Sequence, residues 1–498
     1  MKRNLAGFAR KLVRKAGEQV RELDTDKGLM LAMATGIEGA RARHRLQPAA
    51  SWQPGEPLKL LLSGYSGSRN TGADVRVEEM IRQFRHLFGD DHVQLSILTN
   101  DPLLTRGYFR TVRQLELPKI FPAFLVKTIH EQHGVLACEG SMFKSKFANA
   151  LSTMMVGSLG LAAAEDKLAI AYGGEAGGMD PALESLVSRY CQDAKVIARN
   201  ANSVSVLGKL GIEAEQGTDT AWTFPDPDPA LGEQMLRDIG WDGVTPVLAV
   251  CPINAFWWPV RPDLRKGAER ALTGAHGEDH WGSVYFHKGG SEVRRKQAAY
   301  IEQLAQGVER FCADRDVFVV AVGMEQLDRS ACEALVERLG HGGVLVSDDF
   351  DMFHMISAVR RARWMVSSRY HAIVTSMPAG VLSVGVTMDE RIANLMGDRN
   401  QPELSLRVDD PELGVKMDAA LRRVDRDELA IRQGIEDCVV DALHKMGWMG
   451  ARLVQLVRDK HPDFPFREGL GDTSRPLDHL PPLSDELTAL LARHRKTA

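Results

Sequence analysis

The sequence predicts an α/β protein built from two parallel sheets, each covered by helices on both faces. Three observations lead to this class. Short apolar runs alternate with amphipathic stretches of helical spacing through most of the chain. At 498 residues, the chain is longer than one hydrophobic core usually supports. A proline-rich stretch at 223–230, TFPDPDPA, interrupts the alternation, which then resumes.

The first half opens with the apolar run LKLLLSGY at 58–65 and the amphipathic stretch at 73–88. A strand followed by a helix is the unit of a parallel sheet, because parallel neighbours need a crossover connection. The alternation continues through VQLSILTND, GVLACEGS, a long helix at 146–164, LAIAYGGEAGG, AKVIARN and the helix-like ANSVSVLGKLG. We therefore expect one Rossmann-like domain at 56–224.

Residues 225–240 are expected to form a semi-rigid linker, because prolines alternating with aspartates cannot continue a central strand. The second half, 241–400, repeats the class of the first, with strand candidates TPVLAVCPI, DVFVVAVGM, GVLVSDDF, ARWMVSS and VLSVGV. Two Rossmann-like domains would face each other across a cleft. Ligands of open α/β sheets bind beyond the carboxyl ends of the strands, so functional residues are expected there.

Composition excludes several classes of protein. The net charge of −4 gives no support for nucleic-acid binding, although a local basic patch stays compatible with it. Six scattered cysteines without a C-x-x-C pair suit a reducing compartment. The start of the chain has charges throughout and no apolar core, so no secretory signal is predicted. The uncharged run 147–164 contains polar residues, which favours a core helix over a membrane span. We expect a cytoplasmic protein.

The two ends of the chain are predicted to be helical. Residues 1–50 form a basic helical segment, with seven Lys or Arg against one Glu in the first 21 positions. Such a helix can lie on an anionic membrane, so a peripheral contact through residues 1–23 stays open beside a solvated helix packed on the protein. Residues 401–498 form a helical extension and tail, which either crosses back onto the first domain or makes a homodimer contact.

The stretch SSRYHAIVTSMPAG at 367–380 joins a strand candidate to a short helix. If the helix begins near Tyr370, its free N–H groups and positive dipole end favour an anion. Arg369 adds a fork that suits carboxylate or phosphate, and His371 adds a group that titrates near neutral pH. The alternative is that Arg369 lies on a surface and His371 is hydrogen-bonded in the core.

The glycine-rich turn GYSGSRNTGAD at 64–74 follows the first strand candidate. It has neither the Lys-Ser/Thr of a P-loop nor the spacing G-x-G-x-x-G, so it does not indicate nucleotide binding. We assign Asn70, Thr71 and Gly72 to substrate binding, because glycines let the backbone approach a ligand closely. The alternative is a structural turn in which Asn70 or Thr71 caps the following helix.

Two other strand ends in the first half carry candidate residues. Glu139 in CEGSMFKSK is a carboxylate that could act as a base toward a hydroxyl, while an N-cap role for Ser141 is the alternative reading of this stretch. Arg199 in VIARNANSV follows the next strand candidate. It is a second arginine for an anion, or a surface residue.

Two stretches of the second half give weaker signals. His287 and Lys288 precede a pair of glycines in VYFHKGGSEVRR and are assigned to substrate binding. Asp349 and Asp351 in SDDFD have a spacing that suits a metal, but they precede a helix, where acidic residues cap the end. We expect capping and no metal site.

Taken in order, these stretches resemble the polysaccharide pyruvyl transferase family. The similarity covers roughly 58–395 and rests on GYSGSRNTGAD, GVLACEGSMF, VIARNANSVSVLGKLGI with GTDTAW, and SSRYHAIVTSMPAGVLSVGV. The Arg-x-His-Ala element and the N-T-G loop are its most specific parts. By position, Arg369 and His371 match the family's donor pocket, and Arg199 matches an arginine that the family commonly has.

The resemblance implies a GT-B-like fold and transfer of a pyruvyl group from phosphoenolpyruvate to two hydroxyls of a sugar, which forms a cyclic ketal. It implies a free or lipid-linked glycan acceptor and no cofactor beyond phosphoenolpyruvate as donor. His371 is the expected proton donor or phosphate partner, and Glu139 the expected acceptor base. The chain departs from the family at Ala73, which precedes Asp74, and at Cys138-Glu139-Gly140, both on the acceptor side.

Two rival functions remain open. One is a glycosyltransferase of the same fold that uses a nucleotide-sugar. The other is a catalytically degenerate family member that binds components of polysaccharide biosynthesis.

Overall fold

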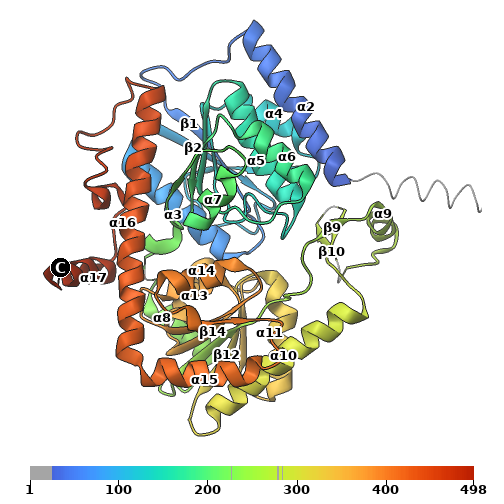
Figure 1. Cartoon of the computed structure of the whole chain (residues 1–498), viewed down its shortest axis with the longest axis vertical. Coiled ribbons are helices and arrows are strands. Elements are labelled where there is room, and N and C mark those ends of the chain that lie inside the picture. Colours follow the sequence, from blue (N-terminus) through green and yellow to red (C-terminus); the bar gives the residue numbers. More distant parts are fainter. Residues whose placement is uncertain (1–24, 226, 278–279, 283, 498) are drawn as a thin grey trace, which may run out of the picture.

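A computed structural model describes residues 25–225, 227–277, 280–282 and 284–497. It contains two α/β domains, one above the other in Figure 1, with a long helix running along both. The first domain holds a parallel seven-stranded sheet in the order β3-β2-β1-β4-β5-β6-β7. Its strands are β1 (Leu58–Ser63), β2 (Val93–Thr99), β3 (Arg113–Glu116), β4 (Gly134–Ala137), β5 (Leu168–Gly174), β6 (Lys195–Ala198) and β7 (Ala214–Gln216).

Helices cover both faces of this sheet. The apolar strand β1 is buried almost throughout, as a central strand between two helical layers requires. One core lies under α2, α4, α5 and α6, and the other under α3 and the long helix α16. The helices are α2 (Thr25–Leu46), α3 (Thr71–Phe88), α4 (Pro122–His130), α5 (Asn149–Ala164), α6 (Pro181–Tyr190), α7 (Ala201–Gly208), α16 (Glu428–Lys460) and the 3-10 turn η1 (Ala221–Thr223).

The second domain repeats this architecture around a parallel six-stranded sheet in the order β13-β12-β8-β14-β15-β16. Its strands are β8 (Val247–Cys251), β12 (Phe318–Gly323), β13 (Gly343–Val346), β14 (Trp364–Ser367), β15 (Leu382–Thr387) and β16 (Ser405–Arg407). Its helices are α10 (Ser291–Cys312), α11 (Arg329–Leu339), α12 (Met352–Arg360), α13 (Tyr370–Ser376), α14 (Glu390–Asp398), α15 (Leu413–Arg426), and the turns η2 (Gln326–Asp328) and η3 (Pro402–Leu404). The predicted class of two Rossmann-like domains is confirmed.

Two predicted boundaries are wrong. The second domain extends past residue 400, because β16 pairs with β15 and completes the sheet. The predicted linker 225–240 contains a helix, α8 (Pro229–Asp238), which packs on α12. Asp228 caps α8 by accepting from the N–H of Ala230, and Pro229 takes the first helical position, where a missing N–H costs nothing.

Helices α8 and α12 lie close together because α8 has a glycine, Gly232, at the contact. A Cβ added at Gly232 would lie 2.5 Å from the backbone of Ser357, and the N–H of Gly232 donates to Oγ of Ser357 over 2.9 Å. We expect Gly232→Ala to destabilise the protein by about 1–3 kcal/mol, because backbone cannot yield as a flexible side chain does. Urea denaturation measures this. Gly397→Ala, in α14 where a Cβ meets nothing within 4 Å, is the control and should not destabilise.

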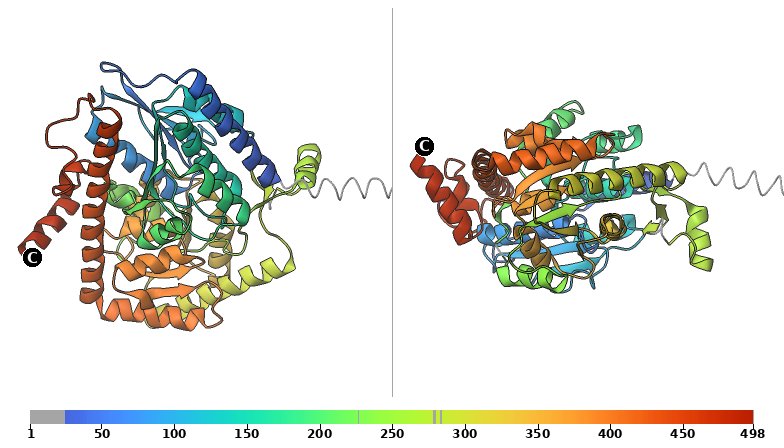
Figure 2. Two further views of the ribbon diagram at one scale, coloured as in Figure 1. Left: turned by 45° about the horizontal axis from the view of Figure 1, so that its top comes forward. Right: turned by 90° about the horizontal axis from the view of Figure 1, so that it is seen from below.

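An insertion of the second domain, residues 261–286, reaches onto the first domain. It forms a small antiparallel sheet from β9 (Arg261–Pro262), β10 (His280–Gly282) and β11 (Tyr285–Phe286), beside α9 (Leu264–Thr273). Tyr285 packs with Ala148 and Ala150 of the first domain, and its hydroxyl donates to Oδ1 of Asp26 over 2.7 Å. Figure 2 shows the insertion on the side of the molecule opposite the C-terminal helix.

The C-terminal extension crosses back onto the first domain. Helix α16 leaves the second domain and packs along the first, where Nε2 of Gln83 donates to the carbonyl of Met446 over 3.1 Å and Arg452 pairs with Glu215. The tail ends with η4 (Pro476–His479) and α17 (Asp485–Thr497). The predicted membrane contact of residues 1–23 lies outside the described residues, and no helix of the described part is long and apolar enough to cross a membrane.

Candidate active site between the two domains

Strand ends of both sheets meet where the domains face each other. The glycine-rich turn after β1 is held against the second domain, because the N–H of Thr71 donates to the carbonyl of Met324 over 2.9 Å. The hydroxyl of Ser347 donates to the carbonyl of Arg69 over 2.6 Å. Asn70 caps α3 by accepting from the N–H of Ala73, so the predicted capping alternative for this residue is confirmed.

Asp219, at the turn after β7, is the centre of a buried ionic cluster. Its Oδ2 lies 3.0 Å from Nε of Arg76 and 3.1 Å from Nη1 of Arg199. The same oxygen lies 3.3 Å from Nε2 of His371, which comes from α13 in the other domain. Asp219 is fully buried, and the side chain of His371 is 15% exposed. One carboxylate thus joins an imidazole and two guanidinium groups across the domain interface.

The electrostatics of this cluster follow from burial and pairing. Burial by itself would raise the pKa of Asp219, but Arg76, His371 and Arg199 hold it well below the ordinary 3.8. Burial lowers the pKa of His371 below 6.5, and the attraction of Asp219 offsets this only in part. At neutral pH the pair is therefore a carboxylate hydrogen-bonded to a neutral imidazole, an arrangement in which the imidazole can accept a proton.

The ionic cluster continues from Arg199 toward the second domain. Arg199 also pairs with Glu175 and lies over the ring of Tyr370, 4.5 Å from its centroid. Nζ of Lys144 lies 3.3 Å from Glu175 and 2.6 Å from Glu390 of α14. Burial lowers the pKa of Lys144 to about 8. Arg199 is thus held between two carboxylates, and the predicted surface alternative for it is wrong.

Arg369 is oriented by two acidic residues that follow β12. Its Nε and Nη2 donate to the carboxylate of Asp328, and Nη2 lies 2.9 Å from Glu325. The side chain is 21% exposed, and Nη1 makes no hydrogen bond within the described residues. Arg369 is therefore not the surface residue of the alternative reading. It is a fixed fork with one edge available to a ligand.

The remaining predicted residues divide into two groups. Gly72 lies directly against His371, since a Cβ there would be 2.3 Å from its Nδ1. Glu139 is partly exposed at the end of β4, and the neighbouring Gly140 lies against Arg199. His287 is buried between two indole rings, with its ring centroid 4.7 Å from that of Trp257. Lys288 is exposed beyond it, so no contact in the described structure joins this pair to the Asp219 cluster.

The capping predicted for the acidic pair after β13 is confirmed for Asp351 only. Asp351 caps α12 by accepting from the N–H of His354 over 2.9 Å. Asp349 pairs with Arg329 of α11.

Five charged residues of the cluster were missed in the sequence: Asp219, Glu175, Arg76, Lys144 and Glu390. Asp219 lies in GTDTAW, one of the stretches that carry the family resemblance. It was missed because no obvious strand pattern precedes it. Glu175 directly follows the two glycines that end β5. Arg76 had the clearest signal, because polar or small residues recur with helical spacing on the buried face of α3 at Gly72, Arg76, Glu79 and Gln83.

The low pKa of His371 leads to a test that needs no substrate. We expect its imidazole to titrate below pH 6.5, as followed by proton NMR with His371→Gln used for assignment. Because the unfolded chain then binds more protons, His371 lowers the stability of the fold as pH falls below 6.5. In His371→Gln this part of the pH dependence should disappear. Titration above pH 6.5 would contradict the assigned burial.

Fold and site together define a two-domain GT-B-like protein with a buried His–Asp pair at its interdomain face. No family model matches the chain, and no curated protein sequence matches it. Among solved structures, a Listeria monocytogenes protein described as a UDP-N-acetylglucosamine 2-epimerase is similar, with a TM-score of 0.50, 10% identity, and coverage of 82% of this chain and 98% of that one. At this identity the likeness shows the GT-B-like fold.

Two other solved structures are similar at lower TM-scores. The UDP-GlcNAc 2-epimerase of Neisseria meningitidis has a TM-score of 0.47 and 10% identity, covering 77% of this chain and 96% of that one. An O-GlcNAc transferase of Thermobaculum terrenum has a TM-score of 0.40 and 12% identity, covering 84% and 73%.

Proposed function

We propose that this protein is a pyruvyl transferase that forms a ketal on a sugar, with phosphoenolpyruvate as the donor. One observation carries the proposal. The four segments on which the family resemblance rests, far apart in the chain, come together around Asp219 and His371. They supply a neutral imidazole and, nearby, an oriented guanidinium with a free edge, which are the groups that an anionic donor and a hydroxyl nucleophile require.

The reaction assigns work to each group. Protonation of the methylene carbon of phosphoenolpyruvate leaves a cation at C2, which a sugar hydroxyl attacks. Loss of inorganic phosphate and attack by a second hydroxyl close the ketal. Of the two protons that the hydroxyls release, one replaces the proton given to the methylene carbon and the other protonates the phosphate. Nη1 of Arg369 would hold the donor's carboxylate or phosphate, and the neutral imidazole of His371 would accept the proton of an attacking hydroxyl and pass it on to the methylene carbon.

In this proposal Arg199 does not bind the donor directly. Its guanidinium is engaged by Asp219 and Glu175 and lies over Tyr370. It therefore holds the start of α13, and with it His371, in position.

The second candidate function is a glycosyltransferase with a nucleotide-sugar as donor. The same His–Asp pair would serve it as a base, and the GT-B-like fold favours it.

Calorimetric titration separates the candidates. We expect phosphoenolpyruvate to bind the wild type and to bind Arg369→Ala about 10–100-fold more weakly, the value of a hydrogen bond to a charged group. Arg426→Ala, an exposed arginine paired with Asp427, is the matched control and should bind normally.

Uridine diphosphate is titrated in parallel. Binding of this nucleotide without phosphoenolpyruvate would favour a glycosyltransferase and overturn the proposal. If neither ligand binds, with or without an oligosaccharide fraction of the cell envelope present, a non-catalytic binding role is the better description.

A further inference from the structure

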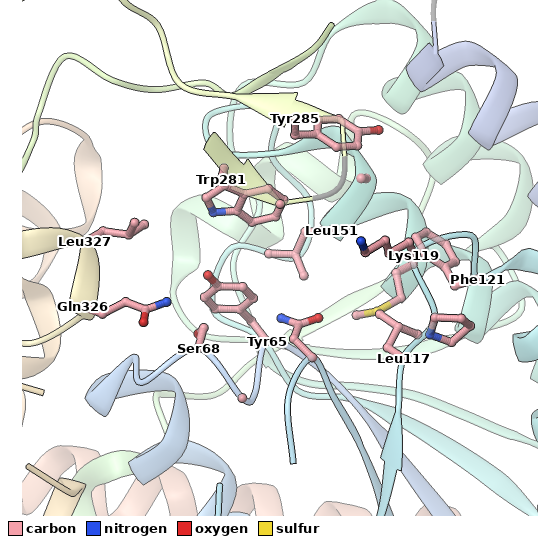
Figure 3. Close-up of a pocket in the computed structure, with 16 residues that line it drawn as sticks. Tyr65, Ser68, Leu117, Lys119, Phe121, Leu151, Trp281, Tyr285, Gln326 and Leu327 are labelled. Carbon is pink, nitrogen blue, oxygen red and sulfur yellow. The ribbon is translucent and has the colours of Figure 1, made fainter. Parts of the chain in front are cut away.

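A pocket lies where three parts of the chain meet (Figure 3). The ends of β1, β2 and β3 form its base, the turn after β12 forms one side, and the insertion covers it. Its volume is about 290 Å³, at the lower end of small-molecule sites. Neither the predicted site residues nor the Asp219 cluster line it.

The walls of the pocket are aromatic and aliphatic. The rings of Tyr65 and Trp281 are nearly parallel, with centroids 6.2 Å apart and an angle of 14° between their planes. Tyr285 stands at right angles to Trp281, with its ring centroid 6.2 Å away. Apolar side chains complete the lining: Leu117, Phe121, Leu151 and Met154.

Polar side chains occupy the rim. Asn100, Lys119 and Gln326 line the pocket and are exposed to solvent. They come from the ends of β2, β3 and β12, so they surround the opening from both domains. Aromatic faces with a few amides and one ammonium group match a pyranose, whose C–H face packs on rings while its hydroxyls exchange hydrogen bonds.

The pocket is connected to the candidate active site through Tyr65. Its hydroxyl donates to Oε1 of Glu325 over 3.2 Å, and Glu325 pairs with Arg369. A ligand packed on the ring of Tyr65 thus lies one residue away from the carboxylates that orient Arg369. The pocket is therefore joined through Tyr65 and Glu325 to Arg369, the residue proposed to hold the donor.

We propose that this pocket binds the acceptor saccharide, with Trp281 of the insertion as the stacking wall. The inference rests on the proposed function for the role of acceptor. The binding of a sugar ring itself follows from the lining. The insertion is therefore a specificity element that the second domain contributes to the first.

Saturation-transfer NMR on the full chain tests the proposal. The probes are the methyl glycosides of glucose, galactose, mannose, N-acetylglucosamine and N-acetylmannosamine. We expect at least one to receive saturation, strongest at the ring C–H protons, and its affinity to fall about tenfold or more in Trp281→Ala, with Trp281→Phe retaining most of it. Trp448→Ala, on α16 and outside the pocket, is the matched control and should bind as the wild type does.

A second variant guards against misfolding of the insertion. Gln326→Leu, at an exposed position, should keep the fold and still weaken the same glycoside severalfold. If no glycoside binds, if Trp281→Ala binds equally well, or if only the apolar dye 1-anilinonaphthalene-8-sulfonate enters the pocket, the proposal is overturned.

The donor titration tells the two proposals apart. Phosphoenolpyruvate should bind Trp281→Ala as it binds the wild type. Glycoside binding without phosphoenolpyruvate binding would reject the proposed pyruvyl transfer and leave the saccharide site in place, whereas the reverse result would reject the saccharide site alone.

Discussion

Asp219→Asn should destabilise the protein by about 3–5 kcal/mol, the usual result of removing one partner from a buried ion pair. The amide cannot balance the buried guanidinium groups of Arg76 and Arg199, which lie 3.0 and 3.1 Å from Oδ2 in the native protein. Urea denaturation at neutral pH measures the loss. Activity should fall as well, since the imidazole of His371 loses the carboxylate that orients it.

The pH dependence of this loss has a definite sign. The pKa of Asp219 in the fold lies well below 3.8, so its charge stabilises the protein above that pH and the stabilisation is lost as pH falls toward the folded-state pKa. The gap between wild type and Asp219→Asn should therefore narrow below pH 3.8. A gap that stays constant there would contradict the electrostatic account.

A second substitution separates charge from shape. Arg76→Met combined with Asp219→Asn removes one unbalanced cation, so the double variant should recover part of the stability of Asp219→Asn without recovering activity. Asp238→Asn, an exposed residue at the end of α8, is the control and should change stability by less than about 0.5 kcal/mol.

Gly72→Ala should separate the two halves of the candidate site. The added Cβ would lie 2.3 Å from Nδ1 and 2.5 Å from Cγ of His371, which Asp219 holds from the other side. The Cβ of His371 would also lie 2.6 Å away, so rotation of the imidazole does not remove the clash and the two domains must move apart. We expect the clash to lower the free energy of unfolding by about 1–3 kcal/mol. The higher helix propensity of alanine offsets part of this loss. Activity should fall about 100-fold for a displacement near 1 Å.

Two controls identify the clash as the cause. Gly208→Ala places a Cβ at the end of α7, where nothing lies within 4 Å, and should leave stability and activity near those of the wild type. The double variant Gly72→Ala/His371→Gly removes all three atoms of His371 nearest to the added Cβ, including the Cβ at 2.6 Å, so part of the stability should return while activity does not. If Gly72→Ala is as active as the wild type, the contact between Gly72 and His371 has no part in catalysis.

Much of the fold could be predicted from local pattern. The alternation of apolar runs and amphipathic stretches identifies both parallel sheets, because that alternation is itself the strand–helix unit. The start of α13 at Tyr370 and the cap of α12 at Asp351 also follow from a few adjacent residues. Arg76 could also have been predicted, because helical spacing places it with other polar or small residues on the buried face of α3.

The linker shows where local pattern misleads. Alternating prolines disfavour a strand and a helix interior, yet Pro229 stands at the first turn, where a helix accepts it. Whether the following residues form a helix depends on the surface of α12, against which Gly232 packs. That surface lies more than a hundred residues further along the chain.

Local sequence pattern was enough to predict the two sheets, the ends of their strands and the residue types that follow them, because each depends on neighbours within a few positions. Which of these residues meet depends on how the two domains pack. His371 follows Asp219 by 152 residues, and their contact depends on how two domains face each other. The pocket under Trp281 likewise needs an insertion of one domain to pack on the other, which no local periodicity encodes.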